Sequence, residues 1–282
     1  NNIDHIIHTA GPRATQCRKH DYTNDSDNGI RVHTMGTSNV LEASRKLNIK
    51  RVIYTSTGSV YLANKIHPPD GTFIKETDSV VPFNSEDIYA SGKVACEYQG
   101  FNYAKAYGIE FVSIRMAHVY GPWPGDMGRG RVVGEMVEAF LNNKEITVEE
   151  QVAQWTYLYD LAEEHYVALT SPNLKYEIFN AGSGTISGLS DVKNILAKKG
   201  DINKIHVDVS KTGSKKFFFR NFFEFYFKQR KCLDRVFGLF SRCAHKIYLH
   251  SKNSFGNFRT VSSGSLRAGF LKPFQANFER LM

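Results

Sequence analysis

The stretch that decides the fold is KRVIYTSTGSVY, residues 50–61. Its residues 51–55 form a run of β-branched and aromatic side chains, which is typical of a buried strand. Three hydroxyl residues, Thr55, Ser56 and Thr57, stand where this strand is expected to end. The segment therefore predicts a strand that delivers hydroxyl groups to one edge of a sheet, where α/β proteins bind their ligands.

The alternation of short apolar runs and helical patterns extends to both sides of this segment. A strand over residues 3–9 and a helix over residues 37–47, with Asn48 as its stop, come before it. After it we expect helices over 89–107, 132–141 and 189–198, strands over 110–116 and 176–180, and a strand that runs into a helix across 155–169. Strands that alternate with helices in this way predict an α/β fold with a parallel sheet.

Composition excludes several classes of protein. Of the 282 residues, 41% are hydrophobic and 23% are charged, which is typical of a globular chain and not of a disordered one. No apolar run reaches the roughly 18 residues of a membrane span. The cysteines Cys17, Cys96, Cys232 and Cys243 form no C-x-x-C pair. We therefore expect no disulfide framework, no metal site and a cytoplasmic location.

The net charge of +8 is unevenly distributed along the chain. Residues 211–282 hold 15 Lys+Arg, 3 Asp+Glu and 14 of the 20 Phe, which leaves residues 1–210 with a charge of −4. The apolar side chains of this tail form no single helical stripe, and no RNA-binding motif accompanies them. We expect a divergent basic, Phe-rich tail without nucleic-acid binding, and we do not favour membrane contact.

A tyrosine and a lysine four residues apart carry the strongest chemical signal. Tyr89 and Lys93, in YASGK, lie on one face of the expected helix. An ammonium group beside a phenol favours the ionised phenol, and a tyrosine with its ordinary pKa near 10 needs such help to act as a base near neutral pH. A hydroxyl at the strand end, such as that of Thr57, is suited to hydrogen-bond the substrate oxygen. By itself this spacing also occurs in solvated helices. Whether it indicates a catalytic pair therefore depends on the neighbouring segments of the sequence.

Six segments of the sequence, taken in chain order, support a catalytic role for this pair. They are residues 4–11, 36–43, 50–61, 89–97, 115–122 and 155–162. Together they resemble the extended short-chain dehydrogenase/reductase family, the NAD-dependent epimerase/dehydratase group. The resemblance implies a Rossmann-type doubly wound parallel sheet, with residues 1–122 as a partial NAD(P)-binding domain, 123–210 as a mixed Rossmann and substrate-binding region, and 211–282 as the tail.

The resemblance also implies roles for individual residues. Tyr89 would be the catalytic acid/base, Lys93 would hold the nicotinamide ribose and lower the pKa of Tyr89, and Thr57 would orient the substrate. The cofactor would be NAD, with NADP left open, and its implied contacts are Thr9, Ala10, Gly11, Arg13, His33, Tyr89, Lys93 and Ala117. The implied substrate contacts are Thr57, Ser59 and His118. The reaction would move a hydride from a carbinol carbon of a small molecule to NAD, and a homodimer through the helices at 37–47 and 89–107 is expected.

Departures from the family pattern refine these expectations. His33 and His118 each stand where the family commonly has Asn, and Ala153 stands where an arginine commonly binds a nucleotide phosphate. Without that arginine, a nucleotide-sugar substrate is less well supported. The sugar 4,6-dehydratases carry an Asp-Glu pair where this chain has Gly58 and Ser59, which argues against elimination by that route.

The first part of the family pattern has no counterpart in this sequence. The glycine-rich turn that holds the pyrophosphate does not occur, and residues 3–9 correspond to the fourth strand, so about 60 residues are expected to be missing. Two other hypotheses remain open besides an active enzyme. One is a truncated, non-catalytic Rossmann-like binding or scaffold protein, and the other is a dehydrogenase attached to a membrane by the basic tail.

Overall fold

A four-stranded parallel sheet forms the centre of the molecule. The computed structural model describes residues 3–12, 25–64, 74–80, 88–121 and 131–211. The strands follow the order β1-β2-β3-β8, each parallel to its neighbour. Their bounds are β1 His5–His8, β2 Arg51–Thr57, β3 Glu110–Met116 and β8 Ile178–Ala181. The predicted parallel sheet is confirmed.

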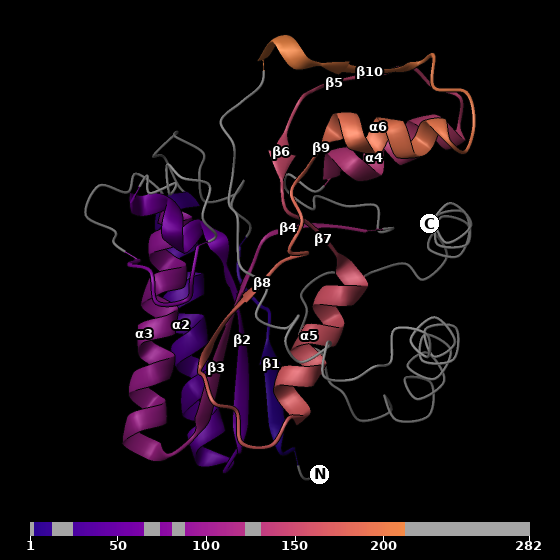
Figure 1. Cartoon of the computed structure of the whole chain (residues 1–282). Coiled ribbons are helices and arrows are strands. Elements are labelled where there is room, and N and C mark those ends of the chain that lie inside the picture. The colour runs from indigo at the N-terminus through magenta and orange to yellow at the C-terminus, as the bar shows by residue number, and fades with distance from the viewer. Residues whose placement is uncertain (1–2, 13–24, 65–73, 81–87, 122–130, 212–282) are drawn as a thin grey trace.

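Helices cover both faces of this sheet, as Figure 1 shows. α2 (Asp25–Lys46) and α3 (Ile88–Tyr107) lie side by side on one face, and α5 (Leu158–Thr170) lies on the other. α3 approaches β3 closely at Gly100, where a Cβ atom would stand 2.1 Å from the ring of Phe111. The doubly wound arrangement predicted for the chain is therefore confirmed.

Successive residues of β2 point to opposite faces of the sheet and belong to two separate apolar cores. Val52 and Tyr54 pack with Phe111 beneath α2 and α3, whereas Ile53 packs with Leu161 beneath α5. This is the period of two that a strand imposes, and a strand buried on both faces needs no polar alternation. All seven residues of β2 are buried.

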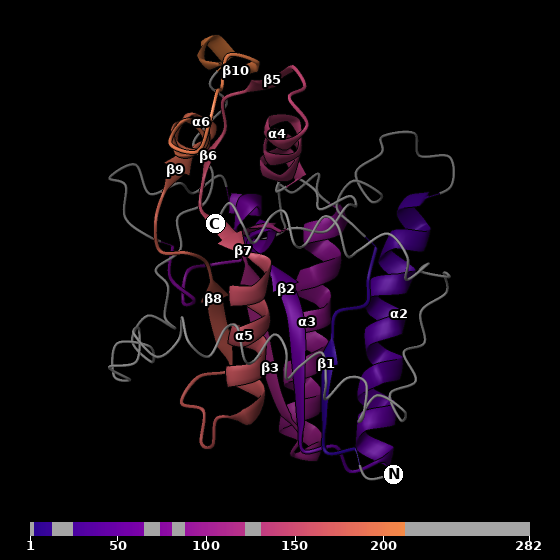
Figure 2. The same ribbon diagram turned by 90° about the vertical axis from the view of Figure 1, so that its right-hand side faces the viewer.

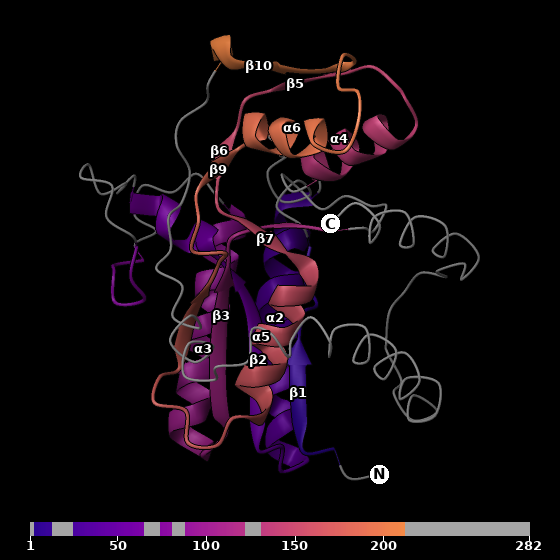
Figure 3. The ribbon, with the colours of Figure 1, turned by 45° about the vertical axis from the view of Figure 1, so that its right-hand side comes forward.

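A smaller lobe lies beyond the ends of the sheet strands (Figure 2, Figure 3). It contains the helices α4 (Arg131–Leu141) and α6 (Leu189–Ala197). Three pairs of short strands accompany them: β5 (Ile146–Glu149) with β10 (Ile205–Asp208), β6 (Val152–Ala153) with β9 (Ser187–Gly188), and β4 (His118–Tyr120) with β7 (Trp155–Tyr157). Its own core is built around Met136, Trp155 and Leu189.

The element ends follow local backbone chemistry. Asn48 and Gly108, which come just after α2 and α3, have positive φ angles of 55° and 72°, a conformation that these two residue types tolerate. The helix predicted over 37–47 is too short, because α2 begins at Asp25. Its first part contains Gly29 and Gly36, which weaken a helical pattern, yet packing of α2 against α3 stabilises it.

Several expectations fall outside the described residues. They include the role of Arg13 and the character of the tail, most of which lies in 212–282. The domain boundaries and the absence of the first strands also stay predictions. Within the described ranges, no helix is both long and apolar enough to cross a membrane.

Candidate active site

The candidate site lies where β1 and β2 part. β1 pairs with β2 as far as His8 and Tyr54, whereas β2 continues to pair with β3 as far as Thr57. The next carbonyl of β2, that of Thr55, accepts a hydrogen bond from Nζ of Lys93 at 2.8 Å. Open α/β sheets bind their ligands at these carboxyl ends of the strands. Lys93 is therefore held at the expected edge of the sheet.

Lys93 is a buried cation with aromatic neighbours. Its side chain is 5% exposed, and Nζ lies 4.8 Å from the ring centre of Tyr54 and 6.0 Å from that of Tyr89. A buried ammonium is costly unless it is hydrogen-bonded, and here a carbonyl and two ring faces contribute to its stabilisation. The tyrosine and lysine that the sequence pairs on one helix face are thus brought together, one turn apart near the start of α3.

His33 lies between two glycines next to this pair. Its ring centre is 5.6 Å from that of Tyr89. A Cβ atom on Gly11 would stand 2.9 Å from Nδ1 of His33 and 3.8 Å from Nζ of Lys93, and one on Gly92 would stand 3.1 Å from the His33 ring. Glycine at both positions therefore leaves room for the imidazole.

Among the described residues, neither ring nitrogen of His33 has a hydrogen-bond partner, although the side chain is only 1% exposed. Buried polar atoms are rarely left in this way, and such exceptions occur at ligand and water sites. Nδ1 lies on the side of Gly11, which follows the exposed residues Thr9 and Ala10 at the end of β1. The two ring nitrogens of His33 can therefore form hydrogen bonds with a ligand that carries hydroxyl groups and lies beside Gly11.

Two neutral histidines surround the Lys93 cation. Burial, and then the charge of Lys93, lower the pKa of His8 to about 4. The same causes, with a small contribution from His8, lower the pKa of His33 to about 4. His8 Nε2 lies 3.0 Å from Oγ1 of Thr37. At neutral pH both imidazoles are uncharged, so they leave the positive charge of this cluster on Lys93.

The remaining predicted site residues follow the strand ends. Thr57 is the last residue of β2, and its Oγ1 accepts a hydrogen bond from the backbone N–H of Ser59 at 3.2 Å. Ala117 follows β3, and its N–H donates to the carbonyl of Ala181 at 2.8 Å. His118 begins β4, and its ring centre lies 5.7 Å from that of Trp155 in the small lobe. These three sites lie on adjacent strand ends, and their contacts to a ligand stay predictions.

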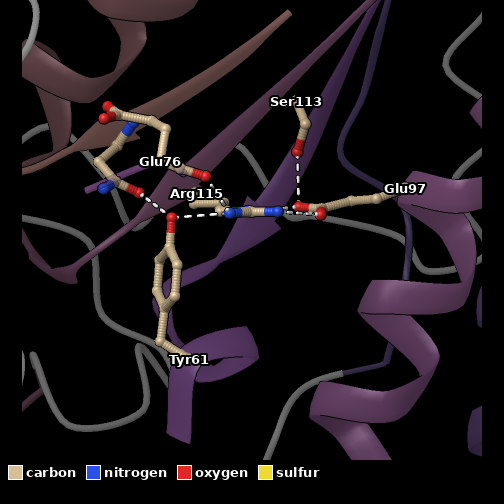
Figure 4. A network of polar contacts seen from close by, with 6 residues as sticks. Tyr61, Glu76, Glu97, Ser113 and Arg115 are labelled. Carbon is tan, nitrogen blue, oxygen red and sulfur yellow. Dashed lines mark hydrogen bonds and ion pairs between the residues drawn. The ribbon is translucent and has the colours of Figure 1, made fainter. Parts of the chain in front are cut away.

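A buried ion pair supports the turn after Thr57 (Figure 4). Arg115 donates to both carboxylate oxygens of Glu97, at 3.0 Å from Nε and 2.7 Å from Nη2. It also donates to the hydroxyl of Tyr61 at 2.7 Å, which in turn donates to Oδ1 of Asn180 at 2.9 Å. Tyr61 belongs to the short helix η1 (Gly58–Asn64) that follows Thr57 directly. The network therefore ties this turn to β3, β8 and α3.

Two polar residues at the site carry little signal in the sequence. The carbonyl of Thr55 holds Lys93, and its hydroxyl lies 2.8 Å from Nε2 of His165 on α5. The sequence pattern identifies Thr55 only as part of the hydroxyl triplet, and it does not identify His165. His165 follows Leu161 by four residues and so lies on the apolar face of an amphipathic helix. This position is the sequence signal that could have indicated a buried imidazole.

α5 also buries a carboxyl group that the sequence does not single out. Glu164 is 4% exposed, and burial, followed by Asp160 and Glu163, raises its pKa to about 8. A raised pKa in the folded state means that the unfolded chain loses the proton first, so Glu164 destabilises the fold increasingly as the pH rises from about 4.5 to 8.

Glu164→Gln is therefore expected to stabilise the protein at high pH. The gain should be about 2 kcal/mol at pH 8, after discounting for relaxation around the site, and should vanish near pH 4. Thermal unfolding of both forms at pH 4, 6 and 8 measures it, with the exposed Glu138→Gln on α4 as control. A gain that does not depend on pH would contradict this account of Glu164.

A doubly wound parallel sheet that carries a tyrosine–lysine pair at its strand ends defines a class, the Rossmann-type proteins of the short-chain dehydrogenase/reductase kind. Residues 1–182 match the NAD dependent epimerase/dehydratase family, and the chain belongs to that family. The family resemblance seen in the sequence is thereby confirmed, as is the expectation of a chain from an enzyme family.

Solved and curated relatives agree with this assignment. The crystal structure of the UDP-glucose 4-epimerase of Thermus thermophilus with NAD has a TM-score of 0.64 and 25% identity, covering 80% of this chain and 72% of that chain. A putative UDP-glucose 4-epimerase of Methanocaldococcus jannaschii is 24% identical over 230 residues, 76% of this chain and 71% of that protein. Cinnamoyl-CoA reductase 1 of Petunia hybrida is 27% identical over 202 residues, 70% of this chain but only 56% of the reductase.

Proposed function

We propose that this chain binds NAD at the ends of β1 and β2 and carries the catalytic groups of an epimerase or dehydrogenase that oxidises a secondary alcohol. The observation that supports this most is the meeting of Lys93, Tyr89, His33 and Gly11 at the point where β1 and β2 part. Such a reaction needs a tyrosine that transfers a proton and a cation held in a fixed position. It also needs space for the cofactor, which a glycine without a side chain provides.

Each group has a proposed task. Lys93, held by the Thr55 carbonyl, binds the nicotinamide ribose and favours the phenolate form of Tyr89. Tyr89 removes the proton from the substrate hydroxyl, and Thr57 orients that hydroxyl. The ring nitrogens of His33, beside Gly11, suit a ribose hydroxyl or an ordered water. NAD bound beside these residues would supply the acceptor for the hydride of the carbinol carbon.

The substrate is proposed to be a sugar or a related secondary alcohol. The relatives named as UDP-glucose 4-epimerases favour a nucleotide sugar. Ala153, however, is a small residue that is 2% exposed and pairs with Ser187 between β6 and β9, so it offers no charge to a phosphate. The sugar is therefore better supported than the nucleotide in this proposal, and a sugar without a nucleotide or another secondary alcohol is an alternative substrate.

Binding of the cofactor tests this function directly. The 282-residue chain is expected to bind NADH saturably in a fluorescence titration. Lys93→Met should weaken that binding by about tenfold, because it removes a charged hydrogen-bond donor to the ligand. Lys105→Met, an exposed lysine near the end of the same helix, serves as the matched control and should bind like the wild type. A wild-type chain that folds but binds no NADH would overturn the proposal.

The alternative is a non-catalytic Rossmann-like binding or scaffold protein. It predicts a folded chain without saturable NADH binding. The same titration therefore separates the two functions.

A homodimer through α2 and α3 is proposed as well. Val32 and Met35 on α2 are 45% and 56% exposed, and Tyr98 on α3 is 59% exposed. Exposed apolar side chains on two helices that pack side by side are compatible with a surface that pairs with another copy of the chain.

A further inference from the structure

His165 sits on the face of α5 that packs against the sheet. It is 6% exposed, and its helix α5 lies on the face of the sheet opposite to α3, which carries Lys93 (Figure 1, Figure 2). It is thus separated from the candidate site by the thickness of one strand. The proposed function assigns it no task.

The hydrogen bonds of His165 define its tautomer. Nδ1 lies 2.8 Å from the carbonyl oxygen of Leu161, and because a carbonyl only accepts, Nδ1 carries the hydrogen. Burial lowers the pKa of His165, which favours the neutral ring. In that ring Nε2 is an acceptor, so the hydroxyl of Thr55, at 2.8 Å, must donate to it.

Thr55 consequently connects two helices on opposite faces of the sheet. Its hydroxyl donates to His165 on α5, and its carbonyl accepts from Lys93 on α3. A threonine hydroxyl without an outside acceptor turns to nearby backbone carbonyls. Because Nε2 of His165 accepts this hydrogen bond, the rotamer of Thr55 is fixed and its carbonyl oxygen stays available to Lys93.

We propose that His165 is a positioning residue, which acts through Thr55 to hold the carbonyl that fixes the Lys93 ammonium beside Tyr89 and Gly11. Its importance for catalysis rests on the proposed function. The structural link from His165 to Lys93 does not, and it can be measured in the free protein.

Three variants separate this role from simple packing. His165→Leu removes the acceptor, Thr55→Val removes the donor with little change of shape, and His165→Gln keeps an acceptor oxygen near the place of Nε2. The Lys93 ammonium is followed by ¹³C NMR of labelled lysine, with the Lys93→Met variant to assign its signal. Thr170→Val, which removes an exposed hydroxyl bonded to Tyr166 on the same helix, is the control.

The titration midpoint of Lys93 is the decisive readout. It should fall by about half a unit or more in His165→Leu and in Thr55→Val, because an ammonium that loses its acceptor while buried is disfavoured. It should return toward the wild-type value in His165→Gln, and the Leu–Val double variant should shift no further than either single one. NADH affinity is expected to fall roughly fivefold in the same two variants.

The outcomes distinguish this inference from the proposed function. If His165→Leu and Thr55→Val lower thermal stability but leave the Lys93 midpoint unchanged, His165 only packs the core and the inference is wrong. If the midpoint shifts as expected while the wild type binds no NADH, the positioning link stands and the proposed function fails. Thr55→Val keeps the test decisive even where His165→Leu does not fold.

Discussion

Tyr89→Phe is expected to lower turnover by about 100-fold or more while leaving the fold and the NADH affinity nearly unchanged. The substitution removes one hydroxyl group and keeps the ring, which packs 5.6 Å from the ring of His33 and near Lys93. Only the proton-transfer group is lost, so the chemical step should suffer and cofactor binding should not. The loss would appear in kcat and in kcat/KM alike.

The measurement uses a panel of UDP-sugars, free sugars and simple secondary alcohols, with the wild type defining which of them is converted. Tyr107→Phe provides the matched control, because Tyr107 lies at the end of the same helix and is 55% exposed. Full activity in Tyr89→Phe would mean that another group moves the proton. A wild type that binds NADH but converts nothing in the panel would favour the non-catalytic alternative.

The parts of this site that could be predicted are those that depend on local spacing. Tyr89 and Lys93 are four residues apart, and helix geometry alone puts them on one face. The strand Glu110–Met116 is predicted with its observed bounds, because Phe111, Val112 and Ile114 favour a strand directly after the helix stop at Gly108. The family order then indicates which strand ends to examine.

The parts that could not be predicted depend on contacts between distant segments. The carbonyl of Thr55 is a backbone group that no sequence pattern marks. The neighbours of His33 come from the segment that follows β1 and from α3. The pairing of β5 with β10 escapes prediction for a similar reason, since each is four residues long and its partner lies far along the chain. Short strands are defined by their partners more than by their own composition.

The ion pair of Arg115 and Glu97 should give the largest effect on stability. Arg115→Met is expected to cost about 3–5 kcal/mol of the free energy of unfolding. Both side chains are 3% exposed, so the substitution leaves the Glu97 carboxylate buried without its counter-charge. Burial by itself lowers the pKa of Arg115, but the hydrogen bonds and charge of Glu97 raise it overall, which means that the guanidinium is stabilised by its partner.

The double variant Arg115→Met/Glu97→Leu should recover most of that loss. When both charges are replaced by apolar groups of similar size, no charge is left without a partner, and such replacements are often close to neutral. Urea unfolding of the wild type, both single variants and the double variant gives the coupling energy between the two sites. Arg45→Met is the control, because its pair with Glu42 is exposed and worth little.

The stability that the double variant recovers also shows how much the uncharged residues of the network contribute. Ser113 donates to Glu97 at 2.8 Å, and Tyr61 lies between Arg115 and Asn180. Ser113 loses its acceptor in the double variant, so about 1 kcal/mol of the loss should remain, whereas the hydroxyl of Tyr61 still donates to Asn180. A double variant as unstable as Arg115→Met would mean that these hydrogen bonds, and not the charge of Glu97, hold the turn after Thr57 to the sheet. In that case Tyr61→Phe alone should reproduce a large part of the loss.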